Sequence, residues 1–397
     1  MKKLKFTRLL SLLLSLAVMT AAFTGFAVPT AAKSKWDGYT KIASADDLVE
    51  MNKSSGKFYL TKDIDLKGVK WDEAIRFSGT LDGNGYAVKN LTSESYGLFH
   101  SLTGATVKNL GLLNVSIRAD KNSVGALTNG AKNSTIENCY VTGSVSSEKG
   151  HAGGLVGLDS STVKGGNTMK NCVNLADVSS GKYSAFGIIK SVAGDTLTRC
   201  INYGRITGIS AAGGLCDRAE TELTACYNLG EVSAAKAKDV GGIACYVVGT
   251  AKDCATATDT AFASKSAKSK ATADVNISKK SFQKADRYTG FDFGETWTIN
   301  AKINGGCPVL TTMLKNYNGS RPTADTPAGT YEKGVTLTLS TTLENGVIRY
   351  TTNGKAPTAG SPEYTAPIAL NKSATVSAAV FVNGVRAKVL TLKYTIK

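Results

Sequence analysis

Carboxylates are the side chains in this sequence whose type and spacing could support catalysis. They gather in one short stretch, as Asp63, Asp65, Asp72, Glu73 and Asp82. Asp63 and Asp65 are two residues apart and would share one face of a strand, and glycoside hydrolysis needs two carboxylates that face one groove. Asp82 has a simpler role, because within LDGNG it supports a tight turn. We therefore expect no catalytic residue here, and no residue qualifies as a nucleophile.

The sequence contains only two histidines, His100 and His151. Neither begins an HExxH motif, and Cys and His residues do not cluster at the spacing of a zinc site. A catalytic cysteine would need a histidine or a cation as its partner, and neither histidine lies beside a cysteine in the sequence. We therefore expect no metal site, no cofactor and no enzymatic activity.

Three tyrosines are candidate ligand contacts: Tyr140, Tyr203 and Tyr227. Tyr140 and Tyr227 each follow a cysteine of the repeat described below, so both are expected to point outward and to form a stacked strip on one face. Platforms that bind sugars usually consist of such exposed aromatic rings. Singly exposed tyrosines are also ordinary surface residues, and this alternative stays open.

A basic cluster lies between residues 265 and 287, where the acidic residues are Asp274 and Asp286. Its cations are Lys265, Lys268, Lys270, Lys279, Lys280, Lys284 and Arg287. Many weak, salt-sensitive contacts add up, so this cluster is the candidate contact with an anionic cell-wall polymer. The alternative interpretation is a solvated and partly disordered insertion.

The first 32 residues have the pattern of a secretory signal peptide. Four cations precede an apolar run at residues 9–18, and small residues follow at the candidate cleavage sites, Ala27 and Ala32. The run is shorter than the roughly 20 residues of a spanning helix. We expect a secreted or surface-associated bacterial protein without a transmembrane anchor. Its mature chain has 43 basic and 31 acidic residues, or +12, and its location disfavours a nucleic-acid partner.

Two sequence markers recur along the middle of the chain at the same interval. The first marker occupies Leu110, Cys139, Cys172, Cys200, Cys226 and Cys254, with spacings of 29, 33, 28, 26 and 28 residues. The second marker is a glycine followed by a small or apolar residue. It occurs at Gly97-Leu98, Gly125-Ala126, Gly154-Leu155, Gly187-Ile188, Gly214-Leu215 and Gly242-Ile243. Self-similarity at a fixed period of this length is the signature of a repeat architecture.

Within each unit, the residues after the cysteine alternate with the period of a strand, as in Cys200-Ile201-Asn202-Tyr203-Gly204-Arg205-Ile206. This pattern predicts one coil of a parallel β-helix per unit. Coils about 4.8 Å apart would align the cysteines into a ladder of buried thiols, and Asn174, Asn202 and Asn228 into a ladder of amides. The spacing exceeds what a disulfide prefers. For Cys216, Cys245 and Cys307, both the free thiol and the disulfide stay open.

Several stretches resemble the GLUG-motif family of bacterial exported proteins. They are FSGTLDGNGYAVKNL from Phe77 with YGLFHSL after it, and GGLVG at residues 153–157 after NCYVTGSV. KIASADDLVEMN and FYLTKDIDL upstream resemble the entry helix and strand of that family. INGGCPVLTTML resembles its exit, where a tyrosine more often stands at the place of Cys307. The resemblance covers about residues 35–317 and implies a right-handed β-helix with a short capping helix, but no known reaction.

The end of the chain, beyond a linker at residues 316–329, has a different pattern. Alternating strands are separated by Asn345-Gly346, Asn353-Gly354 and Asn383-Gly384, which favour tight hairpin turns. Residues 350–354, YTTNG, with Pro357, Pro362 and Tyr364, resemble the chitobiase/β-hexosaminidase C-terminal-like domain, although Asn353 stands where that family usually has aspartate. The resemblance implies an accessory module that accompanies extracellular enzymes and surface proteins.

The expected fold is therefore all-β. A signal peptide (residues 1–32) precedes a right-handed parallel β-helix (33–317) and a small Ig-like or fibronectin-like β-sandwich (318–397). We expect a non-enzymatic surface or matrix protein for adhesion or for contact with an extracellular glycan or an anionic wall polymer. The alternative is a carbohydrate-active enzyme, either a polysaccharide lyase or a glycosidase, in which the sandwich is an accessory module.

Overall fold

The computed structural model describes residues 34–159, 166–191, 194–220, 222–235, 239–257, 280–315, 321–343 and 346–397. Gly38–Lys397 form one compact unit. The predicted signal peptide and four cations of the basic cluster, Lys265, Lys268, Lys270 and Lys279, lie outside the described residues. Among the residues that are described, no helix is long and apolar enough to cross a membrane.

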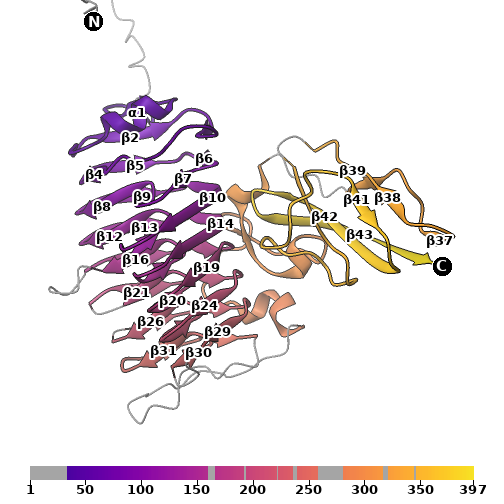
Figure 1. The fold of residues 1–397 in the computed structure, drawn as a ribbon. Coiled ribbons are helices and arrows are strands. Elements are labelled where there is room, and N and C mark those ends of the chain that lie inside the picture. The colour runs from indigo at the N-terminus through magenta and orange to yellow at the C-terminus, as the bar shows by residue number, and fades with distance from the viewer. Residues whose placement is uncertain are drawn as a thin grey trace, which may run out of the picture. The chain divides into compact units, whose positions relative to one another are not determined.

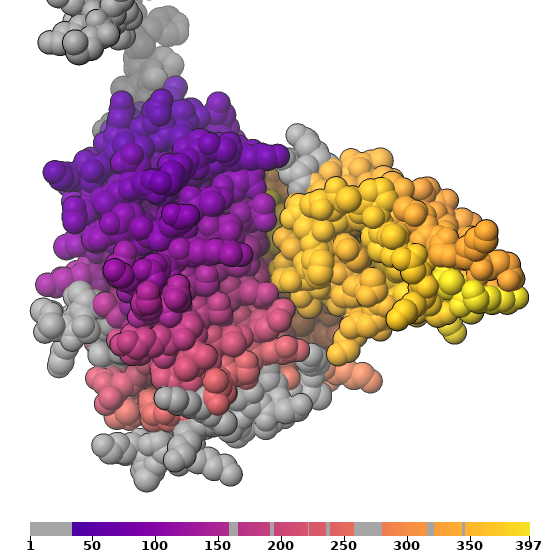
Figure 2. Space-filling view, viewed as in Figure 1, coloured from indigo at the N-terminus to yellow at the C-terminus, as the bar shows by residue number. Residues whose placement is uncertain are grey.

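The middle of the chain is a parallel β-helix, as the repeat predicted (Figure 1). Every pairing between its coils is parallel, and the coils follow one another along the axis in sequence order. Figure 2 shows the same order as successive bands of colour from indigo to red. The first face is a nine-stranded sheet of β1 (Thr40–Ile42), β2 (Lys57–Leu60), β5 (Thr80–Asp82), β9 (Thr106–Lys108), β13 (Thr135–Glu137), β17 (Thr168–Lys170), β22 (Thr196–Thr198), β27 (Leu223–Thr224) and β32 (Ala251–Lys252).

Three further sheets complete each coil. The second face consists of β3 (Ile64–Asp65), β6 (Ala87–Lys89), β7 (Thr92–Ser93), β10 (Gly111–Ala119), β14 (Tyr140–Ser147), β18 (Val173–Asn174), β19 (Asp177–Ser180), β23 (Ile201–Asn202), β24 (Ile206–Gly208), β28 (Tyr227–Asn228), β29 (Val232–Ala234) and β33 (Ala255–Thr256). The third consists of β11 (Val124–Gly125), β15 (Ala152–Gly153), β20 (Ser184–Phe186), β25 (Ala211–Gly213) and β30 (Val240–Gly241). The fourth consists of β4 (Arg76–Phe77), β8 (Phe99–Thr103), β12 (Thr128–Lys132), β16 (Val156–Asp159), β21 (Ile189–Ser191), β26 (Cys216–Ala219) and β31 (Ala244–Val247).

A short helix, α1 (Ala45–Glu50), lies at the N-terminal end of the solenoid. The Ser44 hydroxyl accepts a hydrogen bond from the Asp47 amide at 3.2 Å, which satisfies one of the free donors of the first turn. Leu48 of the helix is fully buried in the same core cluster as Ile42 and Met51. The helix therefore covers the apolar interior of the first coils, as the sequence predicted.

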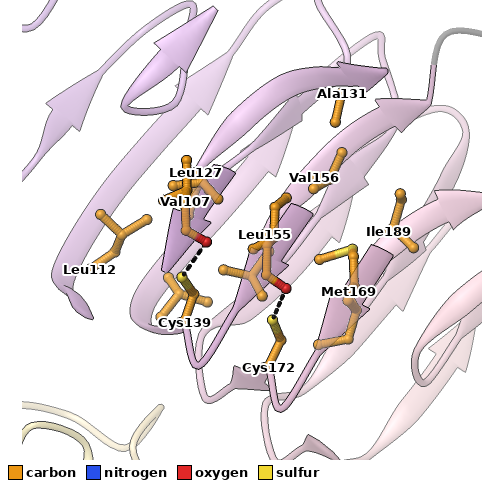
Figure 3. Packing of buried hydrophobic residues seen from close by; sticks show 14 of the residues in the cluster. Val107, Leu112, Leu127, Ala131, Cys139, Leu155, Val156, Met169, Cys172 and Ile189 are labelled. Carbon is orange, nitrogen blue, oxygen red and sulfur yellow. Dashed lines mark hydrogen bonds between the residues drawn. The ribbon is translucent and has the colours of Figure 1, made fainter. Parts of the chain in front are cut away.

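The ladder cysteines point into the core, as predicted (Figure 3). All five are buried and none forms a disulfide. Each thiol has a carbonyl partner within its own coil and one in the preceding coil; Cys172 Sγ, for example, lies 3.4 Å from Lys170 O and 3.5 Å from Ile136 O. Cys216, Cys245 and Cys307 are also free thiols.

The amide ladder also forms. Asn174 Nδ2 donates to Asn202 Oδ1 at 2.7 Å, and Asn202 Nδ2 donates to Asn228 Oδ1 at the same distance. The second sequence marker packs against this ladder: a Cβ atom on Gly187 would lie 2.9 Å from Asn202 Cγ, and one on Gly214 would lie 2.6 Å from Asn228 Cγ. The recurring glycines and asparagines therefore pack against each other, which explains why they recur with the same period.

Sequence reasoning missed a second ladder of amides at the bends that follow the first face. Asn109, Asn138 and Asn171 all have positive φ angles, which asparagine tolerates better than most residues. Asn138 Nδ2 donates to Asn109 Oδ1, and Asn171 Nδ2 to Asn138 Oδ1, both at 2.9 Å. The ladder begins at Asp82, whose Oδ1 accepts from Asn109 Nδ2 at 3.0 Å. Asp82 therefore supports the bends as well as its own turn.

Residues 281–314 follow the solenoid and contain η1 (Ser281–Gln283), η2 (Ala285–Arg287), β34 (Trp297–Thr298), η3 (Asn304–Gly306), β35 (Val309–Leu310) and η4 (Thr311–Leu314). The C-terminal region then consists of β36 (Thr323–Ala324), β37 (Gly329–Tyr331), β38 (Val335–Leu337), β39 (Leu339–Ser340), β40 (Val347–Thr351), β41 (Ile368–Leu370), β42 (Ala374–Val382) and β43 (Val385–Ile396). Asn383 and Gly384, at φ 51° and 79°, form the tight turn predicted between β42 and β43. The predicted all-β fold is confirmed.

Candidate functional site

The three candidate tyrosines project from the second face of the β-helix, but two of them are not exposed. Tyr140 and Tyr227 have exposed fractions of 2% and 1%, and residues 281–314 supply much of the aromatic cluster around Tyr227. Tyr227 Oη donates to Arg287 O at 2.9 Å, and its ring centroid lies 4.8 Å from that of Tyr288. The prediction of an exposed strip is therefore wrong for Tyr140 and Tyr227. The prediction rested on the outward direction alone. The sequence did not show that a later segment covers Tyr227, or that the Tyr140 ring lies against Gly111 of the preceding coil.

Tyr203 is only partly buried and lines a cleft of about 370 Å³. We name this the Tyr203 cleft. Its floor is built by the same position of three consecutive coils, Leu175, Tyr203 and Leu229, and its rim includes Asp177, Arg205, Glu231 and Arg386. The Tyr203 hydroxyl donates to Pro308 O at 2.6 Å, which fixes the ring at the edge of the floor.

The repeat itself creates this floor. Asn174, Asn202 and Asn228 are paired in register, so the residues that follow them also align from coil to coil. A Cβ atom on Gly204 would overlap the carbonyl oxygen of Ala176, so glycine permits the close approach of these bends. Each of the stretches NLADV, NYGRI and NLGEV therefore contributes one leucine or tyrosine and one charged residue. These residues align with the corresponding residues of the neighbouring coils.

The rim of the Tyr203 cleft has a balanced charge. Asp177 Oδ2 lies 3.3 Å from Arg205 Nη2, and Asp177 Oδ1 accepts from the Arg205 amide at 3.3 Å. Glu231 and Arg386 supply a second acid and a second base, and Arg386 Nη1 donates to Pro357 O at 3.1 Å. Two acids against two bases favour a ligand without net charge, and the planar groups offer both donors and acceptors.

Side chains must carry recognition in this cleft, because neighbouring coils already use the backbone donors of its floor. The amide of Tyr203 donates to Asn174 O at 2.7 Å, and the amide of Leu229 donates to Asn202 O at 2.8 Å. A peptide that binds by adding a strand needs an unpaired sheet edge. The geometry therefore favours a ligand with its own hydroxyl and amide groups over an extended backbone.

Three of the carboxylates that drew attention in the sequence, Asp63, Asp65 and Asp72, have structural partners. Asp63 Oδ1 accepts from the Ala87 amide at 3.0 Å, and its Oδ2 lies 3.4 Å from Lys89 Nζ. Asp65 Oδ1 accepts from the Lys67 amide at 2.9 Å. Asp72 forms an exposed ion pair with Lys70 at 2.8 Å. These carboxylates bind backbone amides or neighbouring cations, as expected for support of loops.

Three cations of the basic cluster, Lys280, Lys284 and Arg287, lie within the described residues. Lys280 and Lys284 are exposed, whereas Arg287 is only partly exposed and its carbonyl accepts from Tyr227. No contact that would test binding to an anionic wall polymer is present, so that partner stays a prediction.

Two family models match parts of this chain. The chitobiase/β-hexosaminidase C-terminal domain matches residues 326–391, which supports the resemblance drawn for that region. The N-terminal region of the M26 IgA1-specific metallo-endopeptidases matches residues 21–143. The assignment of the solenoid to the GLUG family stays an interpretation of its motif.

Curated relatives carry the name immunoglobulin A1 protease. The protein from Streptococcus sanguinis is 29% identical over 218 residues, which cover 52% of this chain and 10% of the relative. That from Streptococcus pneumoniae strain R6 is 30% identical over 174 residues, covering 41% of this chain and 9% of the relative. The chain therefore spans about a tenth of the length of these relatives.

Solved structures agree on the fold. A Bacteroides ovatus structure named as an immunoglobulin A1 protease superposes with a TM-score of 0.52 and 21% identity, covering 68% of this chain and 92% of that one. An IgA1 protease structure superposes with a TM-score of 0.51 and 19% identity, covering 62% of this chain and 22% of that one. At such identities the likeness shows the fold alone.

These names correct the expectation that the chain is not an enzyme. The family model that matches its first part belongs to metallo-endopeptidases, and the relatives named above are proteases by name. The sequence argument relied on the absence of catalytic motifs, which says nothing about the kind of protein to which a β-helix of this type belongs. The expectation of a non-enzymatic protein is therefore withdrawn.

The described residues do not fit the metal ion that an endopeptidase of that class implies. Within the described ranges, no three His, Cys, Asp or Glu side chains gather where they could hold a metal ion. His100 lies on β8 and His151 precedes β15, in different coils. Burial lowers the pKa of His151 to about 4, with help from the charge of Lys190. We therefore derive no reaction step through a metal ion.

Proposed function

We propose that this chain is an extracellular, IgA1 protease-like protein that binds the carbohydrate of a glycoprotein in the Tyr203 cleft. The observation that carries the proposal is the cleft itself: a partly exposed tyrosine ring surrounded by two acids and two bases without net charge. A sugar presents apolar C–H groups that pack on an aromatic ring, and hydroxyl groups that both donate and accept hydrogen bonds.

The charge of the rim argues against other small ligands. A phosphate or a carboxylate would need an excess of cations, whereas Asp177 and Glu231 oppose Arg205 and Arg386 here. An apolar ligand would displace water from these charged side chains without replacing its hydrogen bonds, which is unfavourable. A neutral polar ligand satisfies both constraints.

The comparisons support the proposal at a coarser level. One family model takes its name from a chitobiase and β-hexosaminidase domain, and the other from IgA1-specific endopeptidases. The first model is named after enzymes that act on carbohydrate, and the second after an immunoglobulin.

Glycan-array binding followed by titration tests the proposal. We expect Tyr203→Ala to weaken binding of any retained glycan at least tenfold, because it removes the floor of the cleft. Tyr203→Phe keeps the ring but loses the hydrogen bond to Pro308 O that fixes it, so its affinity should lie between those of the wild type and Tyr203→Ala. Tyr183→Ala is the matched control, since Tyr183 is exposed and stacks on His151 outside the cleft. Equal binding by all four proteins, or binding by none, would refute the proposal.

Endopeptidase activity is the second candidate function, and the match to the M26 family model favours it. Incubation of the purified chain with IgA1, with and without a metal chelator, tests this candidate. Heavy-chain fragments that disappear with the chelator would support it. An intact heavy chain under conditions where the glycoprotein is bound would restrict this chain to binding.

A further inference from the structure

A second cleft lies on the same side of the coils, nearer the N-terminus. We name it the Asp63 cleft; its volume is about 270 Å³, and its lining includes Asp63, Asp65, Lys89, Asn90, Asn114 and Arg349. It shares Ala359, Phe381 and Gly384 with the Tyr203 cleft. The turn at Asn383 and Gly384 therefore lies between the two clefts.

A relay of amide groups organises the Asp63 cleft. Asn114 Nδ2 donates to Asn90 Oδ1 at 2.9 Å, and Asn90 Nδ2 donates to Asp65 Oδ1 at 2.7 Å. The backbone N–H of Asn114 donates to Thr142 Oγ1 at 2.8 Å, which connects these side chains to the next coil. These contacts hold the planar amide groups in fixed positions, and so reduce the entropy lost when a ligand binds.

The charges of the Asp63 cleft also balance. Its three acids are Asp63, Asp65 and Glu363, and its three bases are Lys89, Lys315 and Arg349. Two of the acids are paired within the cleft: Asp63 with Lys89 at 3.4 Å, and Glu363 with Arg349 at 3.7 Å. The cleft therefore selects for a neutral ligand by the same argument as the Tyr203 cleft.

The Asp63 cleft also has an aromatic component. Lys315 Nζ lies 3.3 Å from the centroid of the Tyr86 ring, so this cation covers one face of the ring beside the cleft. Phe381, which lines both clefts, supplies an apolar wall. Apolar walls together with fixed polar groups are typical of small-molecule sites.

The two clefts meet at the Gly384 turn and extend from it in opposite directions along the coils. A Cβ atom on Gly384 would lie 2.6 Å from Thr142 Cγ2, which lines the Asp63 cleft, and 3.3 Å from Leu175 Cδ2, which lines the Tyr203 cleft. Asn90 and Tyr203 lie on the same run of bends, four coils from each other, which is about 19 Å at the spacing of adjacent strands. One short ligand at Asn90 and another at Tyr203 can therefore bind at the same time.

We infer that the Asp63 cleft is a second, separate binding site for a neutral oligosaccharide, which makes the chain bivalent toward carbohydrate. The inference rests on the proposed function for the class of ligand. A chain with two weak sites would bind a surface that carries many copies of a glycan far more tightly than a chain with either site alone.

Calorimetric titration with N,N′-diacetylchitobiose tests the inference, because this disaccharide fills only one cleft at a time. We expect two molecules bound per chain. The Tyr203→Ala variant should bind one molecule, in the Asp63 cleft. The double variant Asn90→Ala/Asn114→Ala should also bind one molecule, in the Tyr203 cleft. Retention on a surface densely coated with the same disaccharide should fall at least tenfold in either variant, with thermal unfolding as the check on folding.

A second measurement uses the wild-type chain and does not depend on folding of a variant. Reductive methylation of Lys89 and Lys315 should slow when the disaccharide is present, whereas that of the exposed Lys284 should not change. One molecule per chain that is lost in Tyr203→Ala, with no protection of Lys89, overturns the second site but leaves the proposed function. Failure to bind both this disaccharide and every glycan of the array overturns the proposed function. Binding that survives Tyr203→Ala and protects Lys89 moves the site to the Asp63 cleft alone.

Discussion

At the residue scale, the glycines of the repeat mark close contacts between coils. A Cβ atom on Gly214 would overlap the carbonyl oxygen of Gly242, whereas one on Gly130 would lie 3.5 Å from Leu158 O, in ordinary contact. We expect Gly214→Ala to lower the free energy of unfolding by about 3 kcal/mol, at the upper end for overpacking. Gly130→Ala is the matched control and should change it by less than about 1 kcal/mol.

Denaturant titration of both variants checks this prediction. Equal stability of the two variants would mean that the coils adjust to a methyl group at the bend. The glycine marker would then reflect something other than close approach.

His151 makes the stability of the folded chain depend on pH. Burial lowers its pKa from 6.5 to about 4, with a contribution from Lys190. As the pH falls, the unfolded chain gains a proton near 6.5 and the folded chain only near 4, so stability is lost across that interval. The expected loss is about 1–2 kcal/mol, since the ring is partly exposed.

The difference in unfolding free energy between the wild type and His151→Gln, measured from pH 7 to pH 4, isolates this contribution. The wild type should lose stability relative to the variant as the pH falls. Parallel curves would show that His151 titrates alike in both states.

Individual residues also show what sequence reasoning could and could not predict. The inward cysteines and the ladder of Asn174, Asn202 and Asn228 followed from one period, because register is fixed once the coil length is known. Exposure of Tyr140 and Tyr227 did not follow. The cover of Tyr227 comes from residues more than 50 positions later, and no local pattern indicates where such a segment packs.

At the element scale, the thiol ladder behaves as a row of small apolar groups. Burial raises the pKa of Cys139 to about 12, so the reactive thiolate is scarce at neutral pH. We expect the five ladder thiols to resist a thiol reagent in the native protein and to react fully after unfolding. Cys307 is partly exposed and should react first.

Mass spectrometry after timed labelling, with Cys307→Ser as the control, checks the order. Ladder thiols that react as fast as Cys307 in the native protein would contradict the inward ladder. The raised pKa of Cys139 also predicts that stability falls as the pH rises above about 9, since only the unfolded chain ionises there.

The elements themselves were largely predictable, whereas the cleft was not. The strand period and the Asn-Gly pairs indicated the β-helix and the β42–β43 hairpin. The Tyr203 cleft needs the coil bends, residues 281–314 and the C-terminal region together. Tyr203 was one of the three candidate tyrosines, but Arg386 is 183 residues away in the sequence, and no spacing rule links the two.

At the scale of the whole molecule, charge is expected to govern retention at an anionic surface. The chain carries +16 at pH 7, and exposed ion contacts are screened within about 8–10 Å at physiological salt. We expect cosedimentation with anionic wall polymer to weaken steeply as salt rises. Replacing Lys280 and Lys284 with Gln should weaken it further and leave unfolding nearly unchanged, because exposed charges contribute about 1 kcal/mol or less each.

Retention that does not respond to salt, or that is identical in the Lys280→Gln/Lys284→Gln protein, would remove charge as its mechanism. Binding of neutral disaccharide should depend little on salt in the same experiment, which separates wall retention from the two clefts.

Hydrogen exchange of the wild-type chain, with and without a saturating neutral glycan identified on the array, tests the central claim most directly. The account predicts slower exchange in the peptides that contain Leu175–Asp177, Tyr203–Arg205 and Leu229–Glu231, and unchanged exchange at the first face of the coils. Protection at the first face, or binding of the glycan without protection of these three bends, would contradict carbohydrate recognition in the Tyr203 cleft.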